Sequence, residues 1–198
     1  MGPFVAAAVV AGAFLGHAGA IPPSLTRSLD TVTTLLLGVL LFFVGVQVGG
    51  NRQAWQVVQR FGVRVLLLPL AVAAGSLAGA VAAGALLRMP LTDAGAVGAG
   101  FGWYSFSAVL LSRLHSPQLG ALAFLANVLR ELLAMAVTPY VARYIGRIAA
   151  VAPGGATTMD VTLPIVAKAA GEDAAVLAFL SGAVLSLLVP LLVPLFVL

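Results

Sequence analysis

The chain has 198 residues, of which 62% are hydrophobic and only 8% are charged. A soluble domain is about 45–50% apolar and about 25% charged, so this composition excludes a soluble globular fold and a disordered chain. Ten basic residues against six acidic ones give a net charge of +4, but the basic residues are scattered rather than gathered in a patch. The sequence therefore predicts an all-α, multi-pass membrane protein that binds lipid and no nucleic acid.

A helix needs about 20 mostly apolar residues to cross the hydrocarbon core of a bilayer. Five segments meet this condition, namely residues 3–21, 31–50, 62–87, 118–142 and 174–198. Two further apolar segments, 94–112 and 149–167, are broken by glycine and proline. Because freed backbone groups cannot face lipid, the broken segments must be buried in protein or line a wet cavity. We expect a single transmembrane transporter domain, 1–198, with about five full spans and two broken or re-entrant segments.

The basic residues predict an orientation in the membrane. If both broken segments are re-entrant, Arg52, Arg60 and Arg64 share a side with Arg143 and Arg147, and fewer basic residues lie opposite. The positive-inside rule then places the N-terminus inside and the C-terminus outside.

The sequence offers no residues for a metal centre or for covalent catalysis by cysteine. It has no cysteine, and its two histidines, His17 and His115, lie far apart. Disulfides, thiolate metal sites and cysteine nucleophiles are therefore excluded. We expect neither an enzyme nor a bound cofactor.

Three charged residues fall inside the predicted membrane segments: Arg130, Glu131 and Asp160. A charge near the bilayer centre costs at least about 2.5–3.5 kcal/mol, so a chain that keeps one usually uses it. Asn127, Glu131 and Thr138 share one face of a helix, and this polar face must turn inward. Arg130 and Glu131 are adjacent and point apart. A structural alternative is that Arg130 pairs with Asp160 and locks two helices.

Helix-breaking residues and hydroxyl groups surround Asp160. Thr157 and Thr158 lie directly before it, between Gly155 and Pro164. Hydroxyl and backbone oxygens at a helix break suit Na⁺, and a carboxylate beside them suits an ammonium group or a proton. The expected coupling ion is H⁺, with Na⁺ as the alternative. The helix N-termini at the two breaks are candidates to hold a substrate carboxylate.

Four other polar or aromatic residues are candidates for the same site. Gln47 lies deep in an apolar span, where it either bonds across helices or lines the site. Trp103, Tyr104 and Ser105 follow a run of glycines, where aromatic faces can contact a cation.

Four short segments, in order along most of the chain, carry a family resemblance. They are 43–47 (Phe-Val-Gly-Val-Gln), 101–105 (Phe-Gly-Trp-Tyr-Ser), 129–133 (Leu-Arg-Glu-Leu-Leu) and 155–164 (Gly-Ala-Thr-Thr-Met-Asp-Val-Thr-Leu-Pro). Together they resemble the lysine exporter LysO family. The resemblance implies an inner-membrane exporter of L-lysine or close analogues. It also implies that the intramembrane acids, here Glu131 and Asp160, are required for transport.

Longer members of that family carry further N-terminal membrane helices before the part that this sequence matches. This difference means that the missing part is a separate small partner subunit, that two copies of this chain build the transporter, or that the chain is truncated. We expect an oligomer, most simply a homodimer. Transport would be secondary, with Glu131 and Asp160 binding the ammonium groups or one of them exchanging a proton, which gives antiport. A cation channel and a pore-forming or structural membrane subunit are the alternatives.

Overall fold

The computed structural model describes residues 7, 10–12, 14–16, 18 and 23–198. It divides into two units, Met1–Val46 and Gln47–Leu198, and α2 (Pro23–Gly50) runs from the first into the second. Within the described residues four helical segments are long and apolar enough to cross a membrane: Thr31–Gly50, Gly62–Leu86, Pro117–Tyr144 and Glu172–Val197. Four of the five predicted full spans are thereby confirmed. The fifth, 3–21, falls largely outside the described residues.

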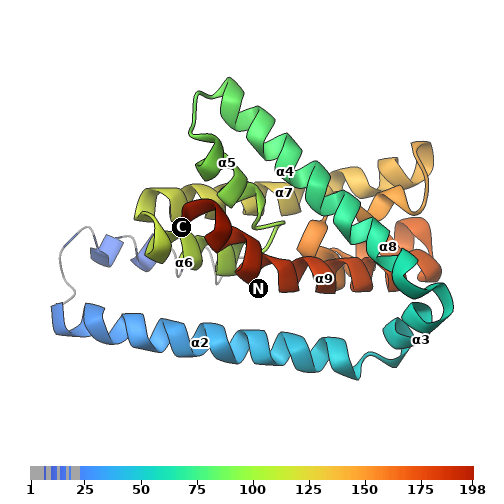
Figure 1. Ribbon diagram of the computed structural model, residues 1–198, viewed down its shortest axis with the longest axis horizontal. Coiled ribbons are helices and arrows are strands. Elements are labelled where there is room, and N and C mark those ends of the chain that lie inside the picture. The colour runs from blue at the N-terminus through green and yellow to red at the C-terminus, as the bar shows by residue number, and fades with distance from the viewer. Residues whose placement is uncertain (1–6, 8–9, 13, 17, 19–22) are drawn as a thin grey trace. The chain divides into compact units, whose positions relative to one another are not determined.

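The unit Gln47–Leu198 alternates long helices with short helical pieces (Figure 1). Its elements are α3 (Arg52–Phe61), η1 (Gly62–Leu66), α4 (Leu67–Leu86), α5 (Leu91–Gly98), α6 (Tyr104–Leu114), α7 (Pro117–Tyr144), η2 (Ala149–Val151), η3 (Gly155–Met159), α8 (Leu163–Ala170) and α9 (Glu172–Val197). The pieces α5 and α6 form one broken segment, and η2, η3 and α8 form the other.

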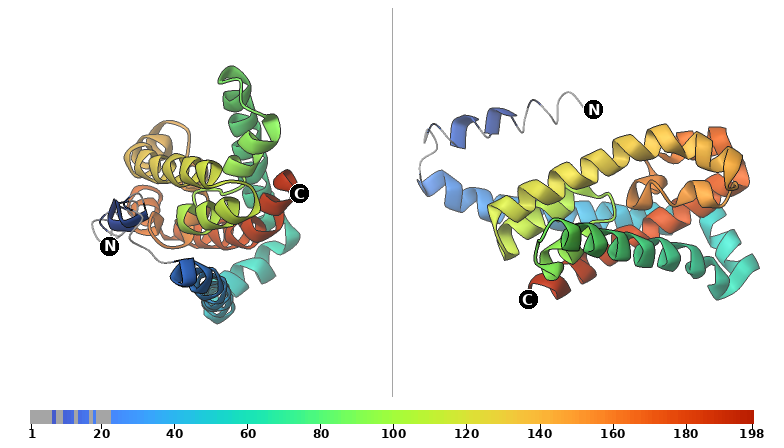
Figure 2. Two further views of the ribbon diagram at one scale, coloured as in Figure 1. Left: turned by 90° about the vertical axis from the view of Figure 1, so that its left-hand side faces the viewer. Right: turned by 90° about the horizontal axis from the view of Figure 1, so that it is seen from above.

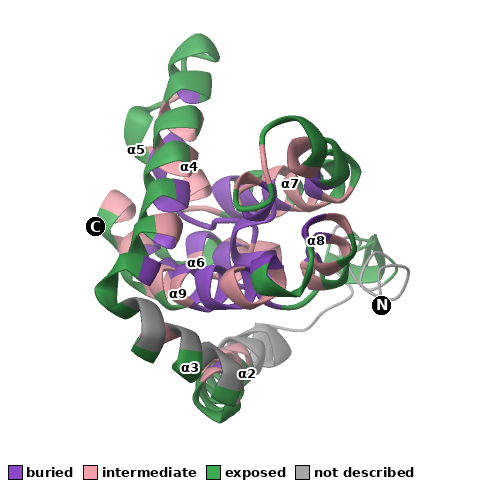
Figure 3. Cartoon of the chain, turned by 90° about the vertical axis from the view of Figure 1, so that its right-hand side faces the viewer, coloured by how far each residue is buried: buried purple, intermediate pink, exposed green. Residues whose placement is uncertain are grey.

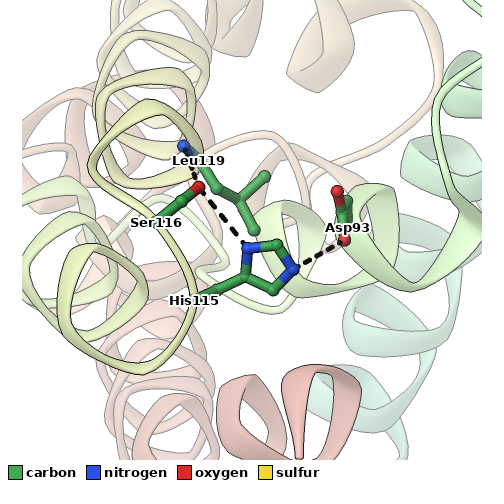
Figure 4. A network of polar contacts seen from close by, with 4 residues as sticks. All are labelled: Asp93, His115, Ser116 and Leu119. Carbon is green, nitrogen blue, oxygen red and sulfur yellow. Dashed lines mark hydrogen bonds and ion pairs between the residues drawn. The ribbon is translucent and has the colours of Figure 1, made fainter.

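The first broken segment, residues 91–114, is a hairpin, which we call hairpin 1. Its chain reverses in the loop between α5 and α6, where Phe101 and Gly102 have φ values of +47° and +99°. Its two ends lie side by side, because His115 Nε2 is 3.6 Å from Asp93 Oδ1 (Figure 4). Next to this contact the Ser116 hydroxyl accepts a hydrogen bond from the Leu119 amide at 3.2 Å and caps α7.

The second broken segment, residues 149–170, also returns to its starting side, and we call it hairpin 2. Val151 near its start and Val166 near its end belong to one buried cluster. Arg147, just before it, lines the same surface cavity as Glu172, just after it. The two ends of hairpin 2 therefore lie together, as those of hairpin 1 do.

The two hairpins open at opposite ends of α7. Hairpin 1 ends where α7 begins, and hairpin 2 starts where α7 ends. The 28 residues of α7 extend about 42 Å at about 1.5 Å per residue, enough to cross a bilayer. Both broken segments therefore fold back on themselves and open at opposite ends of α7, and Figure 2 shows α7 running between their open ends.

Helix α9 forms the centre around which the hairpins pack. In its most apolar stretch 56% of the residues are buried, against 22% for α7. Gly182 allows this packing, because a Cβ there would lie 2.5 Å from the Met159 amide nitrogen of hairpin 2. Figure 3 shows the buried residues gathered on α9 and on the segments between α9 and α7.

The hairpin topology predicts which positions share a side of the membrane. Because the native chain has no cysteine, single cysteines report their own exposure. Thr92→Cys and Leu114→Cys, at the two ends of hairpin 1, should react with a membrane-impermeant maleimide from one side of sealed vesicles, and Arg147→Cys from the other. The cysteine-free parent is the control. Labelling of the first two positions from opposite sides would mean that the segment 91–114 crosses the membrane.

Candidate functional site

The tips of the two hairpins meet beside the middle of α7. The Ala156 amide of hairpin 2 donates a hydrogen bond to the Phe101 carbonyl of hairpin 1 at 2.8 Å. Gly102 and Gly154 make the close approach possible, since a Cβ on Gly102 would lie 3.0 Å from the Gly154 carbonyl oxygen. Phe101 is fully buried. The meeting point is thus a packed junction of irregular backbone at mid-depth.

Asn127 of α7 holds the tip of hairpin 1. Its side-chain oxygen accepts a hydrogen bond from the Gly102 amide at 2.7 Å. Its amide nitrogen donates to the Ala123 carbonyl at 2.9 Å and lies 3.4 Å from both the Val97 carbonyl and the Ser107 hydroxyl. The side chain is 4% exposed. Asn127, predicted to contact substrate, therefore satisfies the broken backbone in this conformation.

Arg130 of α7 holds the first arm of hairpin 2. Its Nε donates to the Pro153 carbonyl at 3.1 Å and its Nη2 to the Ala152 carbonyl at 3.4 Å. Its Nη1 donates to the Ser76 hydroxyl of α4 at 3.0 Å. The ion pair with Asp160 that the structural alternative required is not formed in the described part of the chain.

Three further polar side chains stand beside the junction: Glu131 follows Arg130 on α7, Asp160 follows η3 at the tip of hairpin 2, and Tyr104 begins α6 just after the tip of hairpin 1. Glu131 is partly buried, and its Oε2 has no hydrogen-bond partner among the described residues. The predicted inward face of α7 is confirmed, because Asn127 and Thr138 on either side of Glu131 are buried. The two acids and one phenol thus gather beside the hairpin junction.

Asp160, which the sequence places inside a membrane segment, is an exposed residue in the structure. It follows η3 at the tip of hairpin 2 and therefore stands at the depth of the junction. A carboxylate at that depth is costly against hydrocarbon.

The threonine hydroxyls near Asp160 shape hairpin 2. Thr157 Oγ1 donates to the Gly154 carbonyl at 3.0 Å. Thr158 Oγ1 lies 2.6 Å from the Gly155 carbonyl and 2.9 Å from the Ala178 carbonyl of α9. Both side chains are buried, so the cation-binding role expected of them stays a prediction.

The remaining candidates are only partly brought together. The Trp103 ring stacks on Phe106 with centroids 4.7 Å apart, and Ser105 is exposed beside Tyr104. Gln47 is exposed near the end of α2, and no described contact joins it to the junction. Sequence reasoning missed Ser76, whose only signal was one hydroxyl in an apolar helix.

These features define a class of protein: a multi-pass helical membrane protein in which two broken segments, open at opposite ends of a long helix, meet beside its middle. That arrangement is typical of secondary transporters. The family model described as "Lysine exporter LysO" matches residues 6–197, and the chain belongs to this family, which is one of exporters rather than enzymes.

Two relatives support the assignment. "Lysine exporter LysO" of Escherichia coli (strain K12) is 38% identical over 165 residues, which cover 82% of this chain and 53% of that protein. A Haemophilus influenzae protein whose name provisionally gives it as a lysine exporter is 35% identical over 161 residues, covering 81% of this chain and 82% of that protein. The chain therefore spans about half the length of the Escherichia coli relative. No solved structure matches the chain.

The contact between the hairpin tips predicts a strict requirement for glycine at position 155. Gly155 has φ +63°, and a Cβ there would collide with the Phe101 carbonyl oxygen and lie 2.7 Å from Arg130 Nη2. We expect Gly155→Ala to lower the free energy of unfolding by about 1–2 kcal/mol through backbone strain and by about 1–3 kcal/mol more through overpacking.

Gly62→Ala is the matched control, because Gly62 has φ +59°, close to that of Gly155, and nothing described within 4 Å of a Cβ placed there. Thermal unfolding in detergent should show a larger loss for Gly155→Ala than for Gly62→Ala. Equal losses would contradict the contact and leave only backbone strain.

Proposed function

We propose that this chain exports L-lysine, and related basic amino acids or analogues, by secondary transport across the bacterial inner membrane. Membership of the LysO family and the names of both relatives support lysine as the cargo. The observation that carries the mechanism is the position of Glu131, with its unpartnered carboxylate oxygen, and of Asp160 and Tyr104 beside the hairpin junction. Two carboxylates at mid-depth suit a cargo with two ammonium groups.

The same carboxylates provide a means of coupling transport to protons. An ionised carboxylate with no partner is costly in a low-dielectric interior, and Glu131 Oε2 has none among the described residues. Either a proton or an ammonium group removes that cost, so the two compete for one site. Competition of this kind at a site that opens to alternate sides is sufficient for antiport.

The alternative of an open cation pore has less support. A selectivity filter presents backbone carbonyls to the ion. Here the Phe101 carbonyl accepts a bond from Ala156, and the Pro153 carbonyl accepts one from Arg130. Backbone groups that are already paired favour a site that opens by movement of the hairpins.

The orientation follows from the charged ends of unit Gln47–Leu198. Arg64, Arg143, Arg147 and Lys168 lie towards the end at which hairpin 2 opens, and Arg88 and Arg113 towards the other. We propose that the first end lies inside by the positive-inside rule, which puts the C-terminus outside. The N-terminus inside stays a prediction, because it depends on the segment 3–21.

The homodimer also stays a prediction. Helix α4 has room for close packing against a second copy of the chain, because no described atom lies within 4 Å of a Cβ placed on Gly75 or Gly79.

Neutralising the acids tests the site. We expect Glu131→Gln and Asp160→Asn each to reduce exchange of labelled lysine in proteoliposomes at least tenfold, which is about 1.4 kcal/mol. Glu172→Gln, an exposed acid in the first turn of α9, should exchange lysine at the parent rate. If Glu131→Gln and Asp160→Asn both exchange lysine at the rate of the parent protein, the two acids do not carry transport.

An imposed pH gradient tests the coupling. We expect an acidic lumen to accelerate lysine uptake into proteoliposomes, because protons leave as lysine enters, and a protonophore to abolish the acceleration. Glu131→Gln should not respond to the gradient. Uptake by the parent that is indifferent to the gradient would remove proton antiport while leaving lysine exchange itself in place.

A further inference from the structure

Arg130 is a cation at mid-depth whose partners are all neutral. It donates to two carbonyls, of Ala152 and Pro153, and to the Ser76 hydroxyl. In the described part of the chain no carboxylate pairs with it. A guanidinium carries five N–H groups in a planar fork, so two of them remain after these three bonds. Arg130 therefore keeps both an uncompensated charge and spare donors.

Glu131, the next residue on α7, is an acid that also lacks a partner of opposite charge in the described structure. Glu131 has a buried oxygen with no partner among the described residues, yet it does not pair with Arg130. Successive residues on a helix are rotated by about 100°, so the two side chains diverge. One helix thus presents an unmatched cation and an unmatched anion at the same depth, in adjacent directions. A molecule that carries both an ammonium group and a carboxylate would complement them.

Arg130 also lies against the irregular backbone of both hairpin tips. A Cβ on Gly155 would lie 2.7 Å from its Nη2, and a Cβ on Gly102 would lie 3.8 Å from its Cδ. The guanidinium therefore stands at the junction itself, where the acids also gather.

The start of α8 is one of the helix N-termini that we expected to hold a substrate carboxylate. Its amides already donate to carbonyls of the chain itself. The Leu163 amide donates to the Asp160 carbonyl, and the Ile165 and Val166 amides donate to the Thr162 carbonyl. Pro164, between them, has no N–H. This helix start has no amide to offer a ligand, so the guanidinium is a stronger donor than the start of α8.

We propose that Arg130 binds the carboxylate of the substrate while Glu131 and Asp160 bind its ammonium groups. The inference rests on the proposed lysine transport and narrows its substrate class: the site accepts amino acids and rejects diamines. Cadaverine, which is lysine without its carboxylate, is the decisive probe because it keeps both amines.

The experiment is competition against labelled lysine exchange in proteoliposomes that hold the full chain. For the parent we expect unlabelled lysine to compete at least tenfold more strongly than cadaverine. In Arg130→Gln we expect competition by unlabelled lysine to weaken at least tenfold and competition by cadaverine to stay unchanged, so that the preference for lysine disappears. Arg130→Lys, which keeps the charge but not the planar fork, should retain part of it. Arg143→Gln, exposed in the last turn of α7, should keep the parent preference.

The outcomes separate the inference from the proposed function. Parent protein that exchanges lysine but accepts cadaverine equally well would overturn the inference and leave lysine transport standing. If competition by lysine and competition by cadaverine weaken by the same factor in Arg130→Gln, then Arg130 only holds hairpin 2. Parent protein that exchanges no lysine would overturn the proposed function, and the inference with it. The parent comparison needs no variant, so misfolding of Arg130→Gln cannot hide the answer.

Discussion

The structure depends on satisfying broken backbone at mid-depth, where the bilayer supplies no hydrogen bonds. The two hairpins leave amides and carbonyls that lipid cannot pair. The chain pairs them within itself: the Phe101 carbonyl with the Ala156 amide, the Gly102 amide with Asn127, and the Ala152 and Pro153 carbonyls with Arg130. Polar side chains in the middle of α7 thus perform the task that water performs at the ends of helices in soluble proteins.

Once these bonds are assigned, the remaining polar atoms become informative. Asn127 makes bonds with its oxygen and its nitrogen, whereas Glu131, one turn further along α7, retains an oxygen with no partner in the described residues. A buried polar atom without a partner is costly, so its retention needs a reason outside folding. Thr138 Oγ1 and Ser181 Oγ are also buried without a partner among the described residues, but of the three only Glu131 can carry a charge, which makes it the strongest candidate for the site.

Much of this fold could be predicted because hydropathy and helix breakers act locally. Apolar length marked the four described spans, and glycine and proline marked both hairpins. The inward face of α7 followed from helical spacing alone. The partners of Arg130 could not be predicted, because Ser76 lies 54 residues away and backbone carbonyls leave no trace in a side-chain pattern. The bond between Thr158 and the Ala178 carbonyl was hidden for the same reason, and the exposure of Asp160 depends on how hairpin 2 turns.

The length of α7 has a consequence for the surrounding lipid. Its 28 residues exceed the roughly 20 needed to span about 30 Å of hydrocarbon. A helix that is too long for the bilayer tilts, or thickens the lipid next to it. Arg143 stacks over the Tyr144 ring at 5.3 Å at one end, an amphipathic pair suited to the headgroup layer. Since both hairpins are attached to this helix, hydrophobic mismatch along α7 bears directly on how their tips are held together.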